Sequence, residues 1–468
     1  MRRIELDFEA AIDVADALSD RPGFAFLDSA APSGEVGRWS FVGIEPFGTF
    51  RVADGVARWN GEALAGPPLD ALRQVIARYR LDEGEVDGAS PFRGGGIGFV
   101  SYDFGARLDE RPPAPGPRPA GEELLFRFYD LVLAFDHRNG RCLLYSSGLP
   151  ETDRERRAAR AAARAEGLLA LLRKTRDSVA AVQPVGPWRS NFTAETYAAA
   201  VERVRAYIAA GDIYQANIAQ RFEASLPSGF DAWAFYRRLR HANPAPFGAF
   251  LALDGGRAIA SSSPERFLRC GADGAVEARP IKGTARRAAD SAEDLAAART
   301  LAASEKDRAE NVMIVDLLRN DLSRVCRPGT VAVPVLCGLE SYASVHHLTS
   351  VVTGRLREGF DGLDLVAAAF PCGSITGAPK LRAMEIIAEI EGAGRGIYCG
   401  AIGWLGFDGA MDLNVAIRTV ALEPSRARFG AGGGVTLLSD PAAEYRETLA
   451  KAERIFAAFE PEEPPCSS

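Results

Sequence analysis

The stretch FGAFLALDGGRAIASSSPERFL (residues 247–268) contains two apolar runs, at 247–253 and 258–268, that predict two β-strands. Three further apolar runs downstream also predict one strand each, at 352–356, 400–407 and 412–422. Helices are predicted in the same part of the chain around 291–319, 361–370 and 378–392. Because the helices and strands are mixed without a strict strand–helix alternation, the pattern favours an α+β fold over a doubly wound sheet.

The N-terminal part of the chain also contains short apolar runs that predict strands. They are GFAFLDSA (23–30), RWSFVGI (38–44), GGGIGFVSYD (94–103), FYDLVLAFD (128–136) and CLLYSS (142–147). Gly, Pro and Asp separate them, as is typical of antiparallel sheet. A predicted helix over 153–174 then leads into the polar stretch DSVAAVQPVGPWRS (177–190). We therefore expect an N-terminal region over 1–180 and a C-terminal domain over 190–458.

The C-terminal domain is expected to open with a helix in NFTAETYAAAVERVRAYIAAGD (191–212). Thr193 is a suitable N-cap and Glu195 is well placed in the first turn. A capping box would have Glu or Gln where the chain has Thr196. The helix prediction therefore rests on periodic positions that share one face, namely Ala198, Val201, Val204, Tyr207 and Ile208.

Composition excludes several classes of protein. The chain has 468 residues with a net charge of −7, so it lacks the basic excess expected of a nucleic-acid partner. No apolar run approaches the length of a membrane span, and MRRIELDFEA lacks the apolar core of a signal peptide. The seven cysteines are scattered without a CxxC pair, which argues against a zinc site or a disulfide scaffold. We therefore expect a cytoplasmic enzyme that binds neither nucleic acid nor membrane.

Two acidic pairs occur at helical spacing. Asp307 and Glu310 are three residues apart in SEKDRAENVMIVDLLRND, and Glu444 and Glu447 are three apart in SDPAAEYRETLAKAERI. On a helix, residues three apart lie on one face, so each pair can present two carboxylates together. Carboxylate oxygens from two helices suit Mg²⁺, whereas an isolated pair is more often solvated helix surface.

Glycine-rich segments accompany these acidic pairs. GAGGG (430–434) precedes the second pair, KGT (282–284) follows a predicted strand, and FPCGSITGAPKLRAME (370–385) runs into a predicted helix. Glycine lets backbone N–H groups approach an anion, and a helix N-terminus attracts one. Alone, such segments usually mark tight turns, but together with the acidic pairs they indicate a site for an anionic ligand and a cation.

Eight motifs carry a resemblance to a known family. In chain order they are SSSPERF, RPIKGT, AENVMIVDLLRNDLSRV, HHLTSVVTG, FPCGSITGAPK, YCGAIGW, NVAIRT and EYRETLAKA. Together they resemble the chorismate-binding domain shared by anthranilate synthase, aminodeoxychorismate synthase, isochorismate synthase and salicylate synthase. The resemblance covers nearly the whole chain, since the N-terminal part is similar to that of the two aminating members. It implies two packed β-sheets with helices outside, as in anthranilate synthase component I.

The resemblance also implies roles for individual residues. Glu310 and Glu447 match direct Mg²⁺ ligands, and Glu444 matches a supporting carboxylate. His347 matches a histidine near the departing groups. The positions that match the family's chorismate-binding residues are Gly283, Thr284, Tyr398, Arg418, Gly432, Gly433 and Gly434.

Two positions discriminate among the family's reactions. Members that add water carry a lysine base where this chain has Gln215, and a neutral amide cannot deprotonate water. Lys282 in PIKGT resembles the aminodeoxychorismate synthase branch, whereas anthranilate synthases resemble PIAGT. The resemblance implies that Lys282 attacks chorismate C2, that Glu265 protonates the departing C4 hydroxyl, and that ammonia then adds at C4. There are three alternatives. Lys282 is only a cation that binds a carboxylate, the enzyme makes anthranilate, or the chain is a binding protein without catalytic activity.

The resemblance further implies a partner and a second ligand. The chain has no glutaminase signature, so ammonia from glutamine would need a separate amidotransferase subunit. Several residues resemble the tryptophan pocket of the two aminating members, with Gly248 standing where a larger residue is common, so L-tryptophan is a possible ligand. They are Ser29, Arg38, Trp39, Ser40, Phe41, Pro246, Phe247 and Gly248.

Overall fold

The computed structural model describes residues 1–31, 36–81, 89–109, 116, 121–173, 183, 185–342 and 345–460. The predicted boundary between residues 180 and 190 therefore lies partly outside the described residues. Within the described part, no helix is long and apolar enough to cross a membrane.

The described strands form two antiparallel sheets of twelve strands each. The first sheet has the order β1 (Arg2–Leu6), β10 (Arg141–Ser146), β9 (Leu131–Asp136), β3 (Trp39–Gly43), β2 (Ala25–Asp28), β13 (Phe247–Ala252), β14 (Ala258–Ser263), β23 (Thr419–Glu423), β24 (Arg426–Val435), β12 (Gln215–Ser225) and β11 (Arg189–Ser190), with β20 (Gly377–Ala378) beside β12. The second has the order β17 (Ile281–Arg286), β19 (Val345–Arg355), β16 (Ala275–Arg279), β15 (Arg266–Cys270), β22 (Met411–Asn414), β21 (Ala401–Gly406), β7 (Gly95–Val100), β8 (Leu124–Tyr129), β4 (Gly48–Ala53), β5 (Val56–Trp59) and β6 (Glu62–Ala63), with β18 (Ala332–Ser341) beside β19. Each sheet thus contains strands from before residue 180 and after residue 190.

Three apolar runs that each predict one strand are divided between the two sheets. Residues 128–136 break at Asp130 between β8 and β9, and residues 258–268 break at Pro264–Glu265 between β14 and β15. Residues 412–422 break between β22 and β23, where Arg418 has a positive φ of 50°. At each break the chain crosses from one sheet to the other. The last two crossings are adjacent, because Val415 N–H donates to Glu265 O at 3.0 Å. The crossings therefore bring Glu265 and Arg418 to the junction of the sheets.

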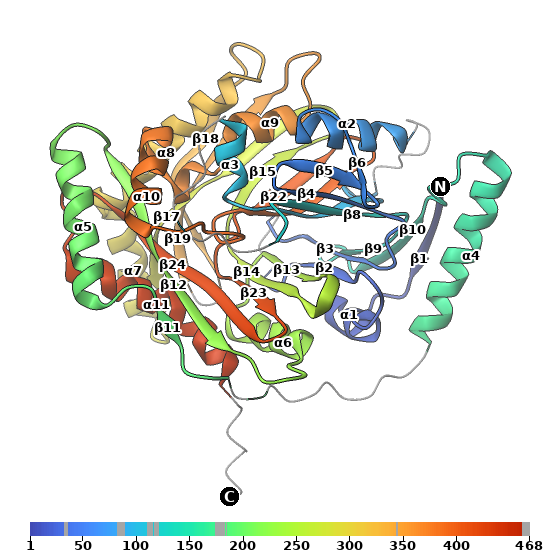
Figure 1. Ribbon diagram of the computed structural model, residues 1–468, viewed down its shortest axis with the longest axis horizontal. Helices are drawn as coiled ribbons and strands as arrows, with labels where there is room; N and C mark the ends of the chain where they lie inside the picture. The colour runs from blue at the N-terminus through green and yellow to red at the C-terminus, as the bar shows by residue number, and fades with distance from the viewer. Residues whose placement is uncertain are drawn as a thin grey trace, which may run out of the picture.

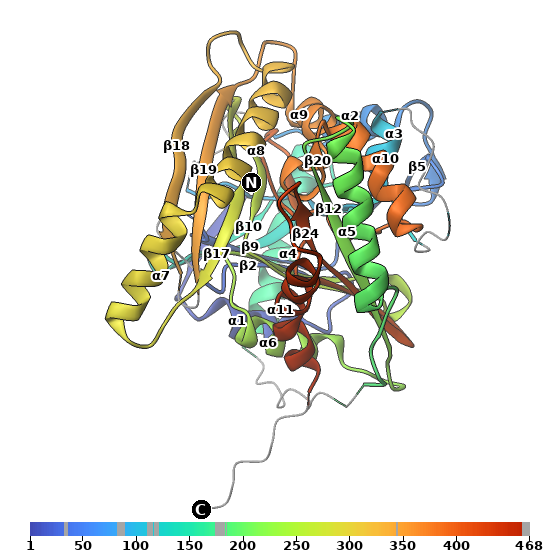
Figure 2. The same ribbon diagram turned by 90° about the vertical axis from the view of Figure 1, so that its left-hand side faces the viewer.

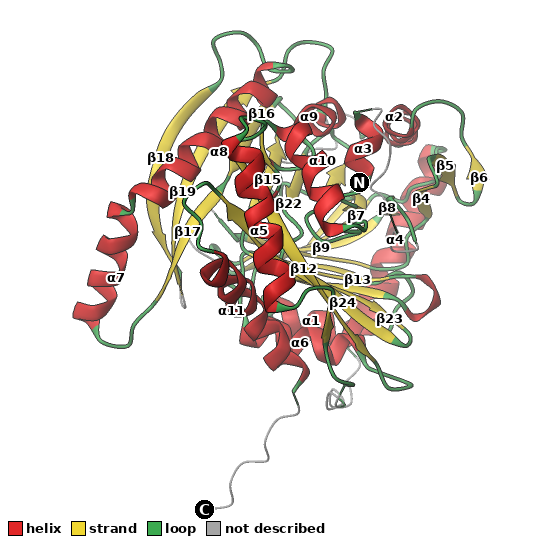
Figure 3. Cartoon of the chain, turned by 60° about the vertical axis from the view of Figure 1, so that its left-hand side comes forward, coloured by secondary structure: helices red, strands yellow, loops and turns green. Residues whose placement is uncertain are grey.

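The helices lie outside the two sheets (Figure 3). They are α1 (Ala11–Leu18), α2 (Pro68–Arg78), α3 (Phe104–Leu108), α4 (Arg154–Leu172), α5 (Ala194–Ala209), α6 (Ala232–Ala242), α7 (Ser291–Ala303), α8 (Glu305–Ser323), α9 (Gly362–Ala369), α10 (Lys380–Glu391) and α11 (Pro441–Phe459). α5, α10 and α11 lie beside β12 and β24 (Figure 1), whereas α7 and α8 lie against β17, β18 and β19 (Figure 2).

The prediction of one helix over 291–319 was wrong. The structure divides this segment into α7 and α8, and the hydroxyl of Ser304 accepts a hydrogen bond from Asp307 N–H and so caps α8. Both helices contact β17, and Glu310 of α8 faces this strand, since its Oε2 lies 3.9 Å from Lys282 Nζ.

Both faces of the central strands of the first sheet are buried. Leu27 packs between the two sheets with Phe99 and Trp404, while the adjacent Phe26 packs with Trp233 of α6. Successive side chains of a strand point to opposite faces, so a strand covered on both sides needs apolar residues at every position. This explains why the strands appear in the sequence as continuous apolar runs.

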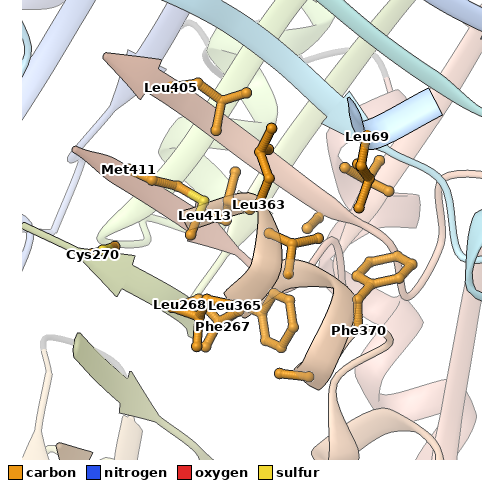
Figure 4. Close-up of a cluster of buried hydrophobic side chains, with 14 of the residues drawn as sticks. Leu69, Phe267, Leu268, Cys270, Leu363, Leu365, Phe370, Leu405, Met411 and Leu413 are labelled. Atoms are coloured by element: carbon orange, nitrogen blue, oxygen red, sulfur yellow. The ribbon is translucent and has the colours of Figure 1, made fainter. Parts of the chain in front are cut away.

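A second core fixes the strands that flank the crossings. Leu363 and Leu365 of α9 pack against Phe267 of β15 and against Met411 and Leu413 of β22 (Figure 4). β15 begins directly after Glu265, and β22 ends four residues before Arg418. Packing of α9 thus holds both crossings in place.

Candidate active site

Lys282 lies at an irregularity in β17. The pairing of β17 with β19 shifts register between Ile281 and Thr284, which turns the Lys282 side chain out of the regular ladder. The side chain is only 11% exposed, and Nζ lies 3.9 Å from Glu310 Oε2. Burial lowers the pKa of Lys282, although the Glu310 carboxylate opposes this effect. A larger share of the amine is therefore unprotonated, and so nucleophilic, than in an exposed lysine.

Glu265 is buried next to this lysine. Its carboxylate accepts a hydrogen bond from the N–H of Ile281, the residue before Lys282, at 3.3 Å. Burial raises the pKa of Glu265 to about 7, and a hydrogen bond from Ser374 and the Ile281 N–H only partly offset the effect. A carboxyl group with this pKa can hold a proton near neutral pH and give it to a leaving group.

Thr284 and His347 form a cross-strand pair between β17 and β19. Thr284 Oγ1 and His347 Nδ1 are 2.9 Å apart. Burial lowers the pKa of His347 to about 3, and the charge of Arg418 acts in the same direction. His347 is therefore a neutral imidazole at neutral pH, and it can donate a hydrogen bond without carrying charge.

Three carboxylates converge from α8 and α11. Lys306 Nζ lies 4.0 Å from Glu310 Oε1 and 3.7 Å from Glu444 Oε1. A Cβ placed on Gly433 would lie 3.0 Å from Glu444 Oε2 and 3.3 Å from Glu447 Oε1. The structure thus brings together the three acidic residues that the resemblance indicates, and a lysine cation lies between two of them.

The electrostatics of these carboxylates differ. Burial raises the pKa of Glu310. Burial acts in the same direction at Glu447, but the Lys451 ammonium, 2.7 Å away, together with Lys306 and Lys282, lowers the pKa of this carboxyl group overall. Glu444 is buried, and its Oε2 has no hydrogen-bond partner in the described part of the chain. In the same described residues, no group of three or more His, Cys, Asp or Glu has the close geometry of a formed metal site. Asp307, the fourth acidic residue of the two pairs, accepts a hydrogen bond from Ser304 at 2.5 Å.

Only some of the predicted substrate-binding residues lie beside Lys282. A Cβ on Gly434 would collide with Gln215 Nε2 and lie 3.2 Å from Lys282 Nζ, so glycine leaves space at the Lys282 amine. Gly283 has a φ of 84° and lies against Asp307 and Leu301. Gly432 closely approaches Ile218 and Ala219 of β12.

Arg418 and Tyr398 complete this set. The Arg418 guanidinium donates to Asn243 Oδ1 at 3.3 Å, and none of the carboxylates in the described ranges forms a salt bridge with it. Burial lowers the pKa of Arg418 to about 10, which indicates a cation held in an unfavourable place without an anion. Tyr398 packs its ring on Gly430 and lines with it a cavity of about 430 Å³ whose lining does not include Lys282, so the structure does not bring Tyr398 together with this lysine.

Sequence reasoning missed several contributors. Ser374 contacts Glu265, while Lys306 and Lys451 neutralise the acidic cluster. The two lysines could have been found, because each lies four residues from a predicted acidic ligand, at Glu310 and Glu447, and helical residues four apart are neighbours. The contact of Ser374 depends on the path of its loop, which no local pattern specifies.

The residues predicted for a tryptophan pocket also lie together, away from Lys282. Ser29, Arg38, Trp39, Phe41, Pro246, Phe247 and Gly248 line one cavity of about 510 Å³. Ser40 does not line the cavity but contacts a lining residue, since its Oγ accepts a hydrogen bond from the Ser29 N–H at 3.0 Å. Arg38 is held by a bidentate pair with Asp136. Binding of L-tryptophan in this cavity stays a prediction.

Comparisons with known proteins agree with this arrangement. The family described as chorismate binding enzyme matches residues 23–457. Anthranilate synthase component 1 of Streptomyces coelicolor is 40% identical over 451 residues, which cover 94% of this chain and 84% of that protein. Aminodeoxychorismate synthase component 1 of Salmonella typhimurium is 43% identical over 393 residues, covering 84% of this chain and 82% of that one. The crystal structure of anthranilate synthase component I from Streptococcus pneumoniae matches with a TM-score of 0.80 and 32% identity, covering 91% of this chain and 93% of that one.

The chain therefore belongs to the chorismate-binding enzyme family, and the predicted α+β fold with two packed sheets is confirmed. Relatives at about 40% identity are named both as anthranilate synthases and as aminodeoxychorismate synthases. The choice between these two reactions consequently depends on the residues of the site.

Proposed function

We propose that this protein aminates chorismate at C4 with ammonia to give 4-amino-4-deoxychorismate, the precursor of 4-aminobenzoate and folate. The observation that carries the proposal is the position of Lys282. Its amine is buried, has a lowered pKa, and lies next to the carboxyl group of Glu265, whose pKa is raised to about 7. A nucleophile and an acid with pKa values displaced in this way suit substitution of a hydroxyl group.

Two steps balance the reaction. The neutral Lys282 amine bonds to C2, both conjugated ring double bonds shift, and the C4–O bond breaks, while Glu265 gives its proton to the leaving hydroxyl to form water. Ammonia then bonds to C4, both double bonds shift back, and the C2–N bond breaks with its electron pair going to Lys282. The product ammonium can return a proton to Glu265, so the net change is ammonia in and water out.

The acidic cluster fits a divalent cation. Glu310, Glu444 and Glu447 supply the oxygen ligands that Mg²⁺ prefers, and the unpartnered Oε2 of Glu444 is available to a cation or its water. Lys306 already lies within 4.0 Å of Glu310 and 3.7 Å of Glu444, which indicates that positive charge is favoured there. When bound, Mg²⁺ would neutralise a carboxylate of chorismate. Arg418, which has no carboxylate partner in the described part, suits the other carboxylate.

Ammonia is proposed to come from a separate glutamine amidotransferase subunit. The Salmonella typhimurium relative is named component 1, a name that implies a second component. With glutamine as the only nitrogen source, the isolated chain should form no product, whereas ammonium salts should support turnover.

The second candidate is amination at C2 with loss of pyruvate, because anthranilate synthase component 1 of Streptomyces coelicolor is 40% identical to this chain. The two reactions are separated by incubating the enzyme with chorismate, ammonium sulfate and Mg²⁺ and analysing the product by chromatography. Anthranilate is fluorescent, and its formation as the main product would refute the C4 assignment.

Two substitutions test the lysine itself. Lys282→Ala should reduce C4 amination at least 100-fold, because the nucleophile is lost. Lys282→Arg keeps a cation but supplies no neutral amine near neutral pH, so it should be equally inactive. An active Lys282→Arg enzyme would show that residue 282 only binds a carboxylate of the substrate.

A further inference from the structure

The side chain of Gln215 is completely buried at the start of β12, yet neither Oε1 nor Nε2 has a hydrogen-bond partner in the described part of the chain. A buried amide normally has its donor and acceptor satisfied, because leaving them unmet destabilises the folded state. Such a residue persists where its polar atoms serve a ligand. Gln215 is therefore a candidate for direct contact with a reactant.

A second buried glutamine on the same strand provides the contrast. Gln220 is 1% exposed, and its Oε1 accepts a hydrogen bond from Ser190 Oγ at 2.7 Å. Its Nε2 donates to Thr448 Oγ1 at 2.5 Å. The two residues share residue type, strand and burial, so the unmet hydrogen bonds of Gln215 are a property of its position beside Lys282.

The amide of Gln215 points toward the reacting amine. A Cβ on Gly434 would collide with Gln215 Nε2 and lie 3.2 Å from Lys282 Nζ, so both terminal groups border the same small space. Gly434 pairs with Asn217 across β12 and β24, two residues along β12 from Gln215, and its lack of a side chain keeps this space open. The Gln215 carboxamide, with Nε2 as its nearest atom, thus borders the place where the proposed bonds form and break.

We propose that the Gln215 carboxamide binds the ammonia that attacks C4. This inference rests on the proposed ammonia-dependent reaction. Oε1 accepts one N–H of ammonia, which leaves the nitrogen lone pair free to bond to C4 as the C2–N bond to Lys282 breaks. A neutral amide suits this role, because a carboxylate at the same place would favour the ammonium ion, which has no lone pair.

Steady-state kinetics with the matched pair Gln215→Met and Gln220→Met tests the proposal. Methionine keeps a similar length but forms no comparable hydrogen bonds. With saturating chorismate and Mg²⁺, Gln215→Met should raise the KM for ammonia at least 10-fold while the KM for chorismate stays within about twofold. Gln220→Met should leave the KM for ammonia unchanged. A Gln215→Met enzyme with a raised KM for chorismate and an unchanged KM for ammonia would overturn the proposal and assign the amide to the C4 hydroxyl of chorismate.

Thermal unfolding of the free enzymes provides a readout independent of activity. Gln215→Met should melt at the same temperature as the wild type or higher, because it removes unmet polar atoms, whereas Gln220→Met should melt lower. A melting temperature lowered equally by both substitutions would overturn the inference that Gln215 lacks structural partners.

The identity of the product separates the proposed ammonia site from the proposed C4 amination. Anthranilate formed with an altered KM for ammonia would refute C4 amination but support the ammonia site, while chorismate turnover independent of ammonia would overturn both.

Discussion

Replacing Glu265 with glutamine should change the pH dependence of stability as well as abolish turnover. Burial raises the pKa of Glu265 from its ordinary value of 4.5 to about 7. Between these two pH values the folded protein holds a proton that the unfolded chain releases. The unfolded state therefore binds fewer protons, and stability falls as pH rises. The contribution of Glu265 is fully present below pH about 4.5 and is lost as pH rises through about 7.

The size of this loss follows from the two values. The difference between about 7 and 4.5, at about 1.36 kcal/mol per pH unit, corresponds to about 3 kcal/mol. The uncharged glutamine side chain of the variant has no such titration. The free energy of unfolding of Glu265→Gln should therefore gain about 3 kcal/mol relative to the wild type when the pH is raised from 4.5 to 8.

Urea unfolding of the free enzymes at pH 4.5 and pH 8 measures this difference directly. Any effect of the new amide group is the same at both pH values and cancels in the comparison. Glu293→Gln, at an exposed position in the first turn of α7, serves as the control. If Glu265→Gln and the wild type differ equally at the two pH values, then Glu265 is an ordinary carboxylate in the folded protein, and its proposed role as the acid is refuted.

Two other substitutions test the surroundings of Lys282. Gly434→Ala introduces a Cβ that collides with the Gln215 amide and approaches Lys282 Nζ, so turnover should fall at least 100-fold while circular dichroism and the melting temperature stay close to the wild type. A fully active Gly434→Ala enzyme would contradict the placement of the reactants over this glycine. Glu444→Gln should raise the Mg²⁺ concentration for half-maximal activity about 10-fold or more, and calorimetric titration of Mg²⁺ should show the same weakening, because one charged oxygen ligand is lost. Unchanged Mg²⁺ binding by Glu444→Gln would remove this residue from the metal site.

Local patterns predicted elements well but could not assign strands to sheets. The runs at 247–253 and 258–268 do contain β13 and β14, which pair antiparallel. The same pattern could not reveal that the chain leaves the first sheet at Glu265 and enters the second, because both sheets bury apolar residues on both faces. Sheet membership is a property of long-range pairing, and it is this crossing that places Glu265 near Lys282.

Two local signals were available and were not used. Ser304 followed by Asp307 is typical of a helix N-terminus, and it marks the break between α7 and α8. At α5, Thr196 takes the place of the usual Glu or Gln, since its hydroxyl accepts the Thr193 N–H at 2.8 Å and so closes a capping box. Both signals use short hydroxyl side chains, which can bond to nearby backbone in several ways.

The polar and charged groups of the candidate site are poorly satisfied by the protein itself. A buried lysine with a lowered pKa, a glutamate with a raised one, an arginine without a carboxylate and an amide without partners all lie around Gly434 or at the sheet crossings. Elsewhere the fold can satisfy a comparable group. The buried Arg395, for example, pairs with Glu391 at 2.6 Å and donates to Ile375 O and Asn217 O. A protein that can satisfy one buried arginine completely has no folding reason to leave another without an anion. The proposed substrate, chorismate, has two carboxylates and a leaving hydroxyl that would complement the unmet charges and hydrogen bonds at the site. A ligand of that kind would remove the cost of burying them together.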